Sequence, residues 1–175
     1  LPIVSIEYKV ENATAIMIDN YSGMEELVRH VIEEHGAREI VYVGGLPDHS
    51  ENIERLKALC DVAGQNNLSI PDENVLGGEW SKNPAKLAVQ NWVLEKGHLP
   101  DAFICANDIM ALGVCEWLSE NGYDVPKDTI VTGYDCIQEA QENIPSITSV
   151  DHEWSTMGKM AVDLVLEMIA TGQKA

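Results

Sequence analysis

Short apolar runs alternate with longer amphipathic segments along the chain. The runs are rich in Ile, Val and Leu, as buried strands are, and they lie at 1–6, 15–18, 40–43, 74–78, 102–106, 129–132 and 147–150. Between most of these runs, apolar residues recur at helical spacing, over 22–36, 52–67, 84–96, 108–118 and 157–170. This alternation predicts an α/β fold in three layers, with a parallel sheet covered by helices on both faces.

Capping and turn residues predict where these helices begin and end. Ser22 is expected to cap the first helix, with Glu25 and Glu26 in its first turn, where the helix dipole favours negative charge. Gly36 and Gly97 each follow a helical pattern, and glycine is the usual residue at a helix carboxyl end. The segment before the last predicted strand contains Pro145 and is expected to be a loop.

The composition is that of a globular protein and excludes some partners. The 175 residues include 11 Lys and Arg against 29 Asp and Glu, which gives a net charge of −18. Because such a chain repels phosphates and anionic head groups, we expect no direct binding to nucleic acid or to a membrane. The sequence contains no run of 18 apolar residues and no basic stretch typical of a signal peptide. It starts inside a predicted strand and without Met, so we expect a piece of a longer protein. Four cysteines without metal-ligand spacing are typical of free thiols in a reducing compartment, so we expect the cytoplasm.

Motifs of common enzymes and metal sites are missing from the sequence. It has no G-x-S-x-G elbow, no P-loop, no G-x-G-x-x-G and no H-E-x-x-H. The five histidines and four cysteines show no metal-ligand spacing, and the cysteines are expected to be buried free thiols. We therefore predict no catalytic residue, no metal and no cofactor. An α/β enzyme that uses Asp108 or Asp135 as acid or base remains an alternative.

Polar and aromatic residues follow four of the predicted strands. In an open α/β sheet, ligands bind beyond the carboxyl ends of the strands, so these residues are expected to meet at one rim. Carboxylates and amides bind hydroxyl groups, a guanidinium offers a fork of donors, and an indole packs against the C–H face of a sugar. The candidates for binding a neutral polyhydroxylated ligand are Arg55, Trp80, Asn107 and Asp135.

Each candidate also has a purely structural interpretation. Asn107 and Asp108 are suited to capping the helix that follows them, and Trp80 is suited to the core. Arg55 fits a solvated helix face, and Asp135 fits an ordinary loop. Their shared location at the predicted rim favours the binding interpretation over these four separate ones.

An ordered set of motifs resembles the effector-binding part of LacI/GalR-type regulators. The strongest pair is A-N-D-I-M-A-L-G at 106–113 with V-T-G-Y-D at 131–135. I-D-N-Y-S-G at 18–23, I-V-Y-V-G-G at 40–45 and P-S-I-T-S-V at 145–150 complete a series that covers nearly the whole chain. The resemblance implies a fold similar to periplasmic sugar-binding proteins, with two α/β lobes joined by crossover strands and the ligand between them.

The resemblance also implies a division of the chain and a set of effector contacts. Residues 19–150 would form the carboxyl-terminal lobe, while 1–18 and 151–175 would belong to the amino-terminal lobe, most of which is absent together with the helix-turn-helix. Arg55, Trp80, Asn107 and Asp135 match effector contacts of the family in the carboxyl-terminal lobe. In the other lobe, the matching positions are Glu7, His152 and Trp154.

By this resemblance, the chain is expected to be the small-molecule sensor of a LacI/GalR-like transcriptional regulator. Its ligand would be a sugar or a related metabolite, and the protein would form a homodimer that binds DNA only through the absent domain. The turn Glu34-His35-Gly36 also resembles a variant in which this sensor is fused to a GGDEF diguanylate cyclase. A further alternative is an extracytoplasmic solute-binding protein, which the free cysteines disfavour.

Overall fold

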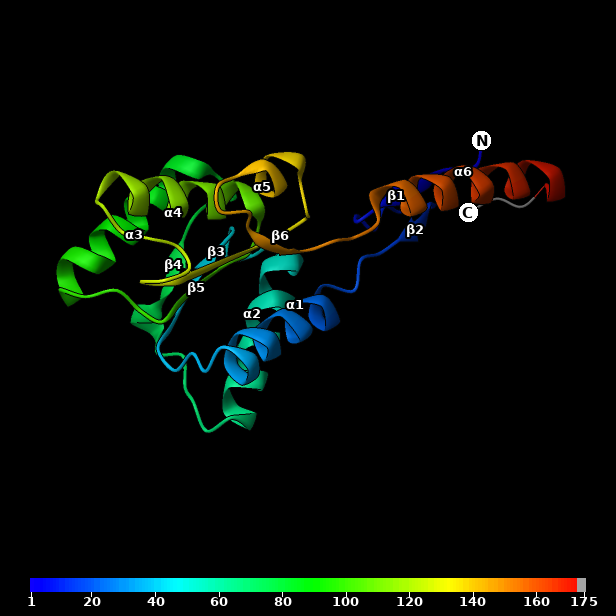
Figure 1. Cartoon of the computed structure of the whole chain (residues 1–175). Helices are drawn as coiled ribbons and strands as arrows, with labels where there is room; N and C mark the ends of the chain where they lie inside the picture. Colours follow the sequence, from blue (N-terminus) through cyan, green and yellow to red (C-terminus); the bar gives the residue numbers. More distant parts are fainter. Residues whose placement is uncertain (173–175) are drawn as a thin grey trace. The chain divides into compact units, whose positions relative to one another are not determined.

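The computed structural model describes residues 1–172 and divides into two compact units. The larger unit is Asn20–Val150, and the smaller unit combines Leu1–Asp19 with the segment that starts at Asp151. Figure 1 shows the elements of both units in sequence colours. Each unit has its own sheet.

The larger unit is built on a five-stranded parallel sheet. Its strand order is β4-β3-β5-β6-β7, and every neighbouring pair is parallel. Because all strands run in one direction, their carboxyl ends lie along one edge of the sheet. The strands are β3 (Ile40–Gly44), β4 (Val75–Gly77), β5 (Ala102–Cys105), β6 (Ile130–Tyr134) and β7 (Thr148–Val150).

Helices cover both faces of this sheet, which confirms the predicted three-layer α/β fold. On one face α1 packs against α2, and on the other α3 packs against α4, with α5 beside α4 (Figure 1). A π-helical turn, η1, continues α1, and a 3-10 turn, η2, precedes β4. The bounds are α1 (Asn20–Arg29), η1 (His30–Glu34), α2 (Ser50–Gln65), η2 (Asp72–Asn74), α3 (Lys82–Lys96), α4 (Asp108–Glu120) and α5 (Gln138–Glu142).

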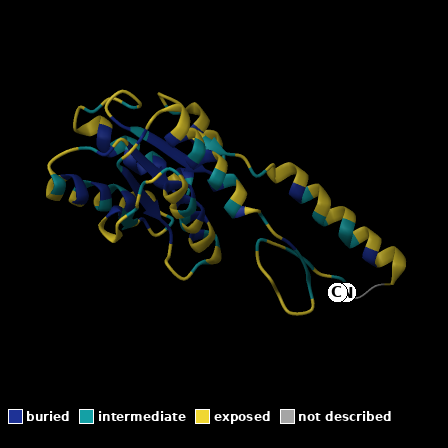
Figure 2. Ribbon diagram, turned by 90° about the horizontal axis from the view of Figure 1, so that it is seen from below, coloured by how far each residue is buried: buried dark blue, intermediate teal, exposed yellow. Residues whose placement is uncertain are grey.

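The central strands are buried on both sides, as parallel strands between two helical layers must be. All residues of β3 and all residues of β5 are buried. Figure 2 shows these strands as the dark-blue interior of the larger unit, with most exposed positions on helix surfaces and loops. The apolar runs of the sequence therefore form the core, and this core holds in place the edge of the sheet at which the strands end.

Three details differ from the predictions. Helix α1 begins at Asn20, so Ser22 lies inside the first turn and is not the cap. The segment before Pro145, expected to be a loop, contains the short helix α5. The cysteines are free, but Cys60 is exposed, so the prediction that all four thiols are buried is wrong. Gly97, by contrast, ends α3 in the left-handed conformation (φ 77°), as glycine at a helix end was expected to do.

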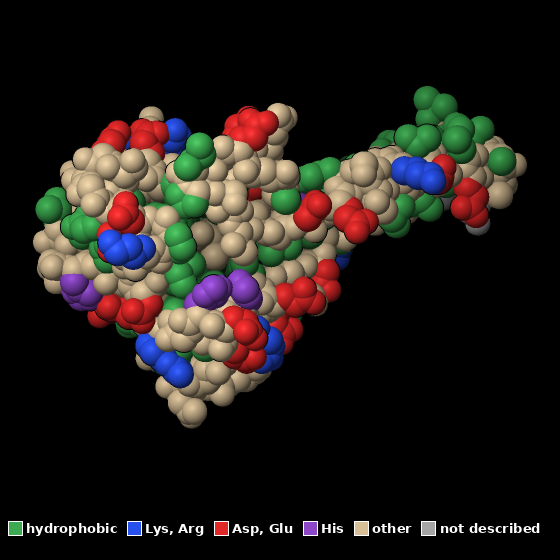
Figure 3. Space-filling model, viewed as in Figure 1, with side chains coloured by type: hydrophobic (Ala, Val, Ile, Leu, Met, Phe, Trp, Pro, Cys, Tyr) green, Lys and Arg blue, Asp and Glu red, His purple; other side chains and the backbone are tan. Residues whose placement is uncertain are grey.

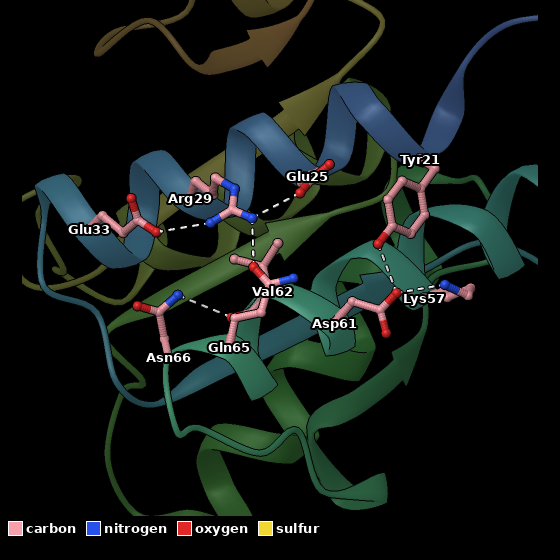
Figure 4. Close-up of polar contacts among 9 residues, drawn as sticks. All are labelled: Tyr21, Glu25, Arg29, Glu33, Lys57, Asp61, Val62, Gln65 and Asn66. Atoms are coloured by element: carbon pink, nitrogen blue, oxygen red, sulfur yellow. Dashed lines mark hydrogen bonds and ion pairs between the residues drawn. The ribbon is translucent and has the colours of Figure 1, made fainter.

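Polar contacts tie α1 to α2 along their exposed sides. Arg29 donates to Glu25 Oε1 at 2.9 Å and to Gln65 Oε1 at 2.6 Å, and Tyr21 donates to Asp61 Oδ2 at 2.8 Å (Figure 4). The bond from Arg29 to Gln65 joins the carboxyl ends of the two helices, the bond from Tyr21 joins the start of α1 to the later part of α2, and the bond from Arg29 to Glu25 lies within α1. Asn20, the first residue of α1, lies next to the candidate residue Arg55 of α2.

Helices α3 and α4 approach closely at Gly113. A Cβ at this position would lie 3.1 Å from the carbonyl carbon and 3.2 Å from the Cα of Lys82, and closer still to its carbonyl oxygen. Since these are backbone atoms, Gly113→Ala is expected to lower the free energy of unfolding by about 1–3 kcal/mol through overpacking. Gly64→Ala is the matched control, because a Cβ there meets nothing within 4 Å. It should stabilise α2 by about 0.5–1 kcal/mol. Urea denaturation measures both, and equal effects would contradict the close approach.

In its described residues, the smaller unit contains a parallel strand pair and one helix. Strand β1 (Val4–Ile6) pairs with β2 (Thr14–Ile16), and α6 (Trp154–Thr171) contacts β1. Much of α6 is apolar yet exposed, as the hydrophobic side chains gathered on this unit in Figure 3 show. Among residues 1–172, none of the helices is both long and apolar enough to cross a lipid bilayer.

Candidate functional site

Arg55 is the centre of the candidate site in the larger unit. It lies on α2 and is only 3% exposed, so the alternative of a solvated helix residue is wrong. Its Nε donates to Asn20 Oδ1 at 2.9 Å, and its Nη1 donates to the backbone carbonyl of Ala106. Its Nη2 lies 3.8 Å from Asp135 Oδ1. One guanidinium thus joins the start of α1 to the ends of β5 and β6.

Two aromatic rings flank this guanidinium. The Arg55 Cζ lies 3.6 Å from the centroid of the Tyr134 ring and 5.7 Å from that of the Trp80 ring. Tyr134 is fully buried at the end of β6, and its hydroxyl donates to the Asn20 carbonyl at 3.4 Å. A buried cation is stabilised when it is both hydrogen-bonded and stacked on aromatic faces. The cluster therefore holds its charge without a bulk-water shell.

Trp80 occupies the loop between β4 and α3 and is partly buried. Its backbone is left-handed, with φ of 56°, as is that of Glu79, with φ of 52°. The indole lies against the backbone of Gly45 at the end of β3, where any Cβ would overlap the six-membered ring. Its Nε1 donates to His49 Nδ1 at 3.0 Å. Trp80 therefore packs against the core's edge, as its structural interpretation proposed, and also stands beside Arg55.

Asn107 and Asp108 follow β5 and start α4. The Asn107 side chain caps this helix by accepting a hydrogen bond from Met110 N at 2.9 Å, so its capping role is confirmed. Asp108 is fully buried and accepts from Ile137 N at 2.8 Å and from Ser149 Oγ at 2.6 Å. Burial raises the pKa of Asp108, and these hydrogen bonds partly oppose the rise. A carboxylate sealed in this way serves the structure of the rim.

Asp135 follows β6 at the same edge of the sheet. Its backbone is left-handed, with φ of 106°, and its N donates to the Val150 carbonyl at 2.9 Å, which ties the loop to β7. The side chain is partly buried, at 23% exposure, beside Arg55. Trp80, Asp135 and Ala106, the residue before Asn107, therefore all lie around the guanidinium of Arg55.

The other three candidates belong to the smaller unit. Glu7 directly follows β1 with φ of 67°, and its N donates to the Ile16 carbonyl at 2.8 Å. The rings of His152 and Trp154 meet edge to face, with centroids 5.1 Å apart. Trp154 starts α6 and is 47% exposed. His152 and Trp154 therefore lie side by side, and Glu7 belongs to the same unit.

The surface of the larger unit has two hollows. One of about 410 Å³ lies beside α4 and the loops 123–125 and 143–145, and one of about 420 Å³ lies between α2 and the end of β4. Neither is lined by Arg55, Trp80, Asn107 or Asp135. Within residues 1–172, no three or more His, Cys, Asp and Glu side chains are arranged to hold a metal ion.

Sequence reasoning missed four residues that build the site. Asn20 and Tyr134 hold Arg55, His49 holds Trp80, and Ser149 holds Asp108. Tyr134 stands inside a recognised motif, but its stacking on a residue 79 positions earlier has no local sequence signal. Asn20 and His49 lie at helix starts, where a polar residue is read first as a cap.

Comparison with known proteins identifies the family. The model of the periplasmic binding protein-like domain matches residues 28–175. The HTH-type transcriptional regulator MalR of Clostridium butyricum is 32% identical over 158 residues, which cover 90% of this chain and 47% of MalR. The chain therefore spans about half the length of the curated relatives it matches.

Solved structures give the same assignment. A sugar-binding regulator of the LacI family from Escherichia coli, complexed with phosphate, is 27% identical with a TM-score of 0.76, covering 86% of this chain and 54% of that one. The regulator CelR in complex with cellobiose is 25% identical with a TM-score of 0.86, covering 99% and 54%. The chain therefore belongs to the periplasmic binding protein-like family, as a ligand-sensing domain of the type found in LacI-family transcriptional regulators.

Proposed function

We propose that this domain binds a neutral sugar or a related polyhydroxylated metabolite and so controls a transcriptional regulator. The observation that carries the proposal is the buried Arg55, which gathers Trp80 and Asp135 at one edge of the sheet. Two similar regulators support the ligand class, since one is described as sugar-binding and the other was solved with cellobiose.

The charges of Arg55 and Asp135 favour a neutral ligand over an anion. The Nε and Nη1 atoms of Arg55 donate hydrogen bonds to protein acceptors, and the carboxylate of Asp135 lies 3.8 Å from Nη2. A ligand anion would compete with this carboxylate and would meet a chain of net charge −18. Hydroxyl groups, in contrast, can donate to Asp135 and pair with Asn107, while Trp80 contacts the apolar face of a sugar ring.

The output follows from population shift. An effector that binds one arrangement of the lobes better than another biases the whole protein, and a coupling of about 1–3 kcal/mol changes its affinity for DNA about 5–150-fold. We infer that DNA is contacted outside this acidic chain and that the protein acts in the cytoplasm. We also infer that Glu7, His152 and Trp154 supply further effector contacts, as the family resemblance implies.

The alternatives have weaker support. MalR is an HTH-type transcriptional regulator by its description, which favours a transcriptional output over a cyclase. The relatives are regulators and not enzymes, and the sealed environment of Asp108 is a poor one for an acid or base that must meet a substrate. The coding sequence on either side distinguishes the outputs: a helix-turn-helix supports DNA binding, a GGDEF domain supports cyclase control, and a signal peptide alone supports a solute-binding protein.

Calorimetry tests the ligand class. The complete gene product that contains this chain is titrated with neutral mono- and disaccharides, nucleosides and sugar phosphates. We expect one neutral saccharide to bind, and we expect Asp135→Asn and Trp80→Leu to weaken binding at least tenfold, or about 1.4 kcal/mol. Glu54→Ala, an exposed change on the same helix as Arg55, is the matched control. A protein that binds only sugar phosphates, or that binds saccharides equally well with both variants, would contradict the proposal.

We further propose that the protein is a homodimer that uses the face beside α4. Ile144 is 95% exposed and projects next to the hollow of about 410 Å³, so one face carries both a knob and a recess, as a two-fold contact requires. The carboxylates on this face are partly neutralised, because Lys86 bridges Glu116 at 2.8 Å and Glu120 at 2.7 Å. These pairs lessen the repulsion that a highly acidic chain would feel against its copy.

Sedimentation equilibrium of the complete gene product tests this face. Ile144→Asp places a charge on the knob and is expected to raise the dimer dissociation constant at least tenfold, because a buried unpaired charge is costly. Ile53→Asp, at a residue of α2 that is 52% exposed, should leave the dimer intact. Equal dissociation of both variants, or a monomeric parent protein, would exclude this interface.

A further inference from the structure

The position of the Trp80 indole depends on a residue that no sequence motif marks. On one side, the ring lies against Gly45, whose missing side chain leaves room for it. The backbone at Glu79 and Trp80 is left-handed, so the loop turns the indole back over the end of β3. Contact with the Gly45 backbone limits how close the ring can come, but it does not fix the ring's rotation in its own plane.

His49 supplies the missing restraint. It is the last residue before α2, and its Nδ1 accepts the indole N–H of Trp80 at 3.0 Å. The two ring centroids lie 6.1 Å apart with planes inclined by 31°, so the imidazole meets the indole from its nitrogen edge. For Nδ1 to accept, the imidazole must be neutral with its proton on Nε2. Trp80 is therefore held at its edge by His49 and flanked by Arg55, 5.7 Å from the ring centroid.

This arrangement decides which part of the indole can serve a ligand. An indole has a single hydrogen-bond donor, and His49 occupies it. We propose that His49 is a positioning residue of the effector site: it fixes the Trp80 indole so that the ring face, and not the N–H, is offered to the effector. The inference rests on the proposed function, and it adds that recognition at Trp80 is by stacking and selects ligands with an apolar C–H face.

Two variants separate the hydrogen bond from the presence of the imidazole. His49→Ala removes the acceptor, whereas His49→Asn puts an amide oxygen close to the place of Nδ1 and keeps one. The indole N–H signals of ¹⁵N-labelled protein report the bond directly, and Trp80→Phe identifies the signal of Trp80. Trp92 provides an internal reference, because its N–H donates to Asn74 Oδ1 at 3.2 Å. Both residues of this bond are distant from His49 in the sequence and lie on other elements.

In His49→Ala we expect the Trp80 N–H signal to shift while that of Trp92 stays in place. The affinity for the saccharide found by calorimetry should fall about twofold to twelvefold, the range of one neutral hydrogen bond. His49→Asn should restore both the signal and most of the affinity. Far-UV circular dichroism of each variant checks that the fold is kept.

The outcomes separate this inference from the proposed function. An unmoved Trp80 signal in His49→Ala overturns the inference, and so does a moved signal with unchanged saccharide affinity. Loss of affinity that His49→Asn fails to restore also overturns it, because the acceptor would then not be what matters. A parent protein that binds no saccharide contradicts the proposed function, while the tether between His49 and Trp80 is still decided by the N–H signals alone.

Discussion

Replacing Arg55 by alanine is expected to lower the free energy of unfolding by about 3–5 kcal/mol, as removing one member of a buried charged cluster does. The side chain is 4% exposed, and its loss leaves the acceptors at Asn20 and Ala106 without their donor and removes the ion pair with Asp135. The face of Tyr134 also loses a cation stacked at 3.6 Å. Urea denaturation followed by far-UV circular dichroism measures the change.

Two further variants show whether the geometry of the guanidinium matters or only its charge. Arg55→Lys keeps the charge, but a single ammonium cannot reach Asn20 and Ala106 together while covering Tyr134, so we expect a loss between wild type and alanine. Glu54→Ala, at the exposed preceding position, should change stability by less than about 0.5 kcal/mol. If Arg55→Ala behaves like Glu54→Ala, Arg55 does not organise the rim.

Hydrophobic periodicity predicts the layers of this fold because burial is what creates both the strands and the helix faces. The apolar run 40–43 becomes the fully buried β3, and the run 102–106 becomes β5 beside it. The short helix α5 was missed because its residues, Gln138–Glu142, are polar apart from Ala140 and carry no apolar period. Capping signals failed at α1 because Asn20 and Ser22 are both suitable caps, and tertiary contacts place Asn20 in the helix.

Only one feature of the candidate site could be predicted from the sequence, namely which residues follow the ends of the parallel strands. The rule that parallel strands end at one edge predicts that Trp80, Asn107 and Asp135 lie there, and in the structure they follow β4, β5 and β6. The rule cannot tell that Arg55 is buried, since that depends on Tyr134 and Asn20, which lie 79 positions after it and 35 before it. Long-range pairs of this kind are decided by packing and leave no periodic trace in the chain.

Asp108 is the second residue at which a single change should have a large effect. It links the start of α4 to the loop after β6, through Ile137 N at 2.8 Å, and to β7, through Ser149 Oγ at 2.6 Å. Asp108→Ala leaves both donors without their acceptor, so we expect a loss of about 2–4 kcal/mol in the free energy of unfolding, since each unsatisfied buried group costs about 1–3 kcal/mol. Asp108→Asn keeps the shape and one acceptor and should lose less.

The pH dependence of the asparagine variant tests the electrostatic part of this argument. Burial raises the pKa of Asp108 above its unfolded value of 3.8, so its ionised form is less favourable in the folded protein. The stabilising contribution of this carboxyl group is therefore fully present below the unfolded pKa and declines as the pH rises through the folded pKa. Asparagine does not titrate, so the advantage of wild type over Asp108→Asn should be larger at pH 4.5 than at pH 7.5 in paired urea denaturations. An advantage that grows toward pH 7.5 would mean that the hydrogen bonds to Ile137 and Ser149 outweigh desolvation and hold the carboxylate in its ionised form.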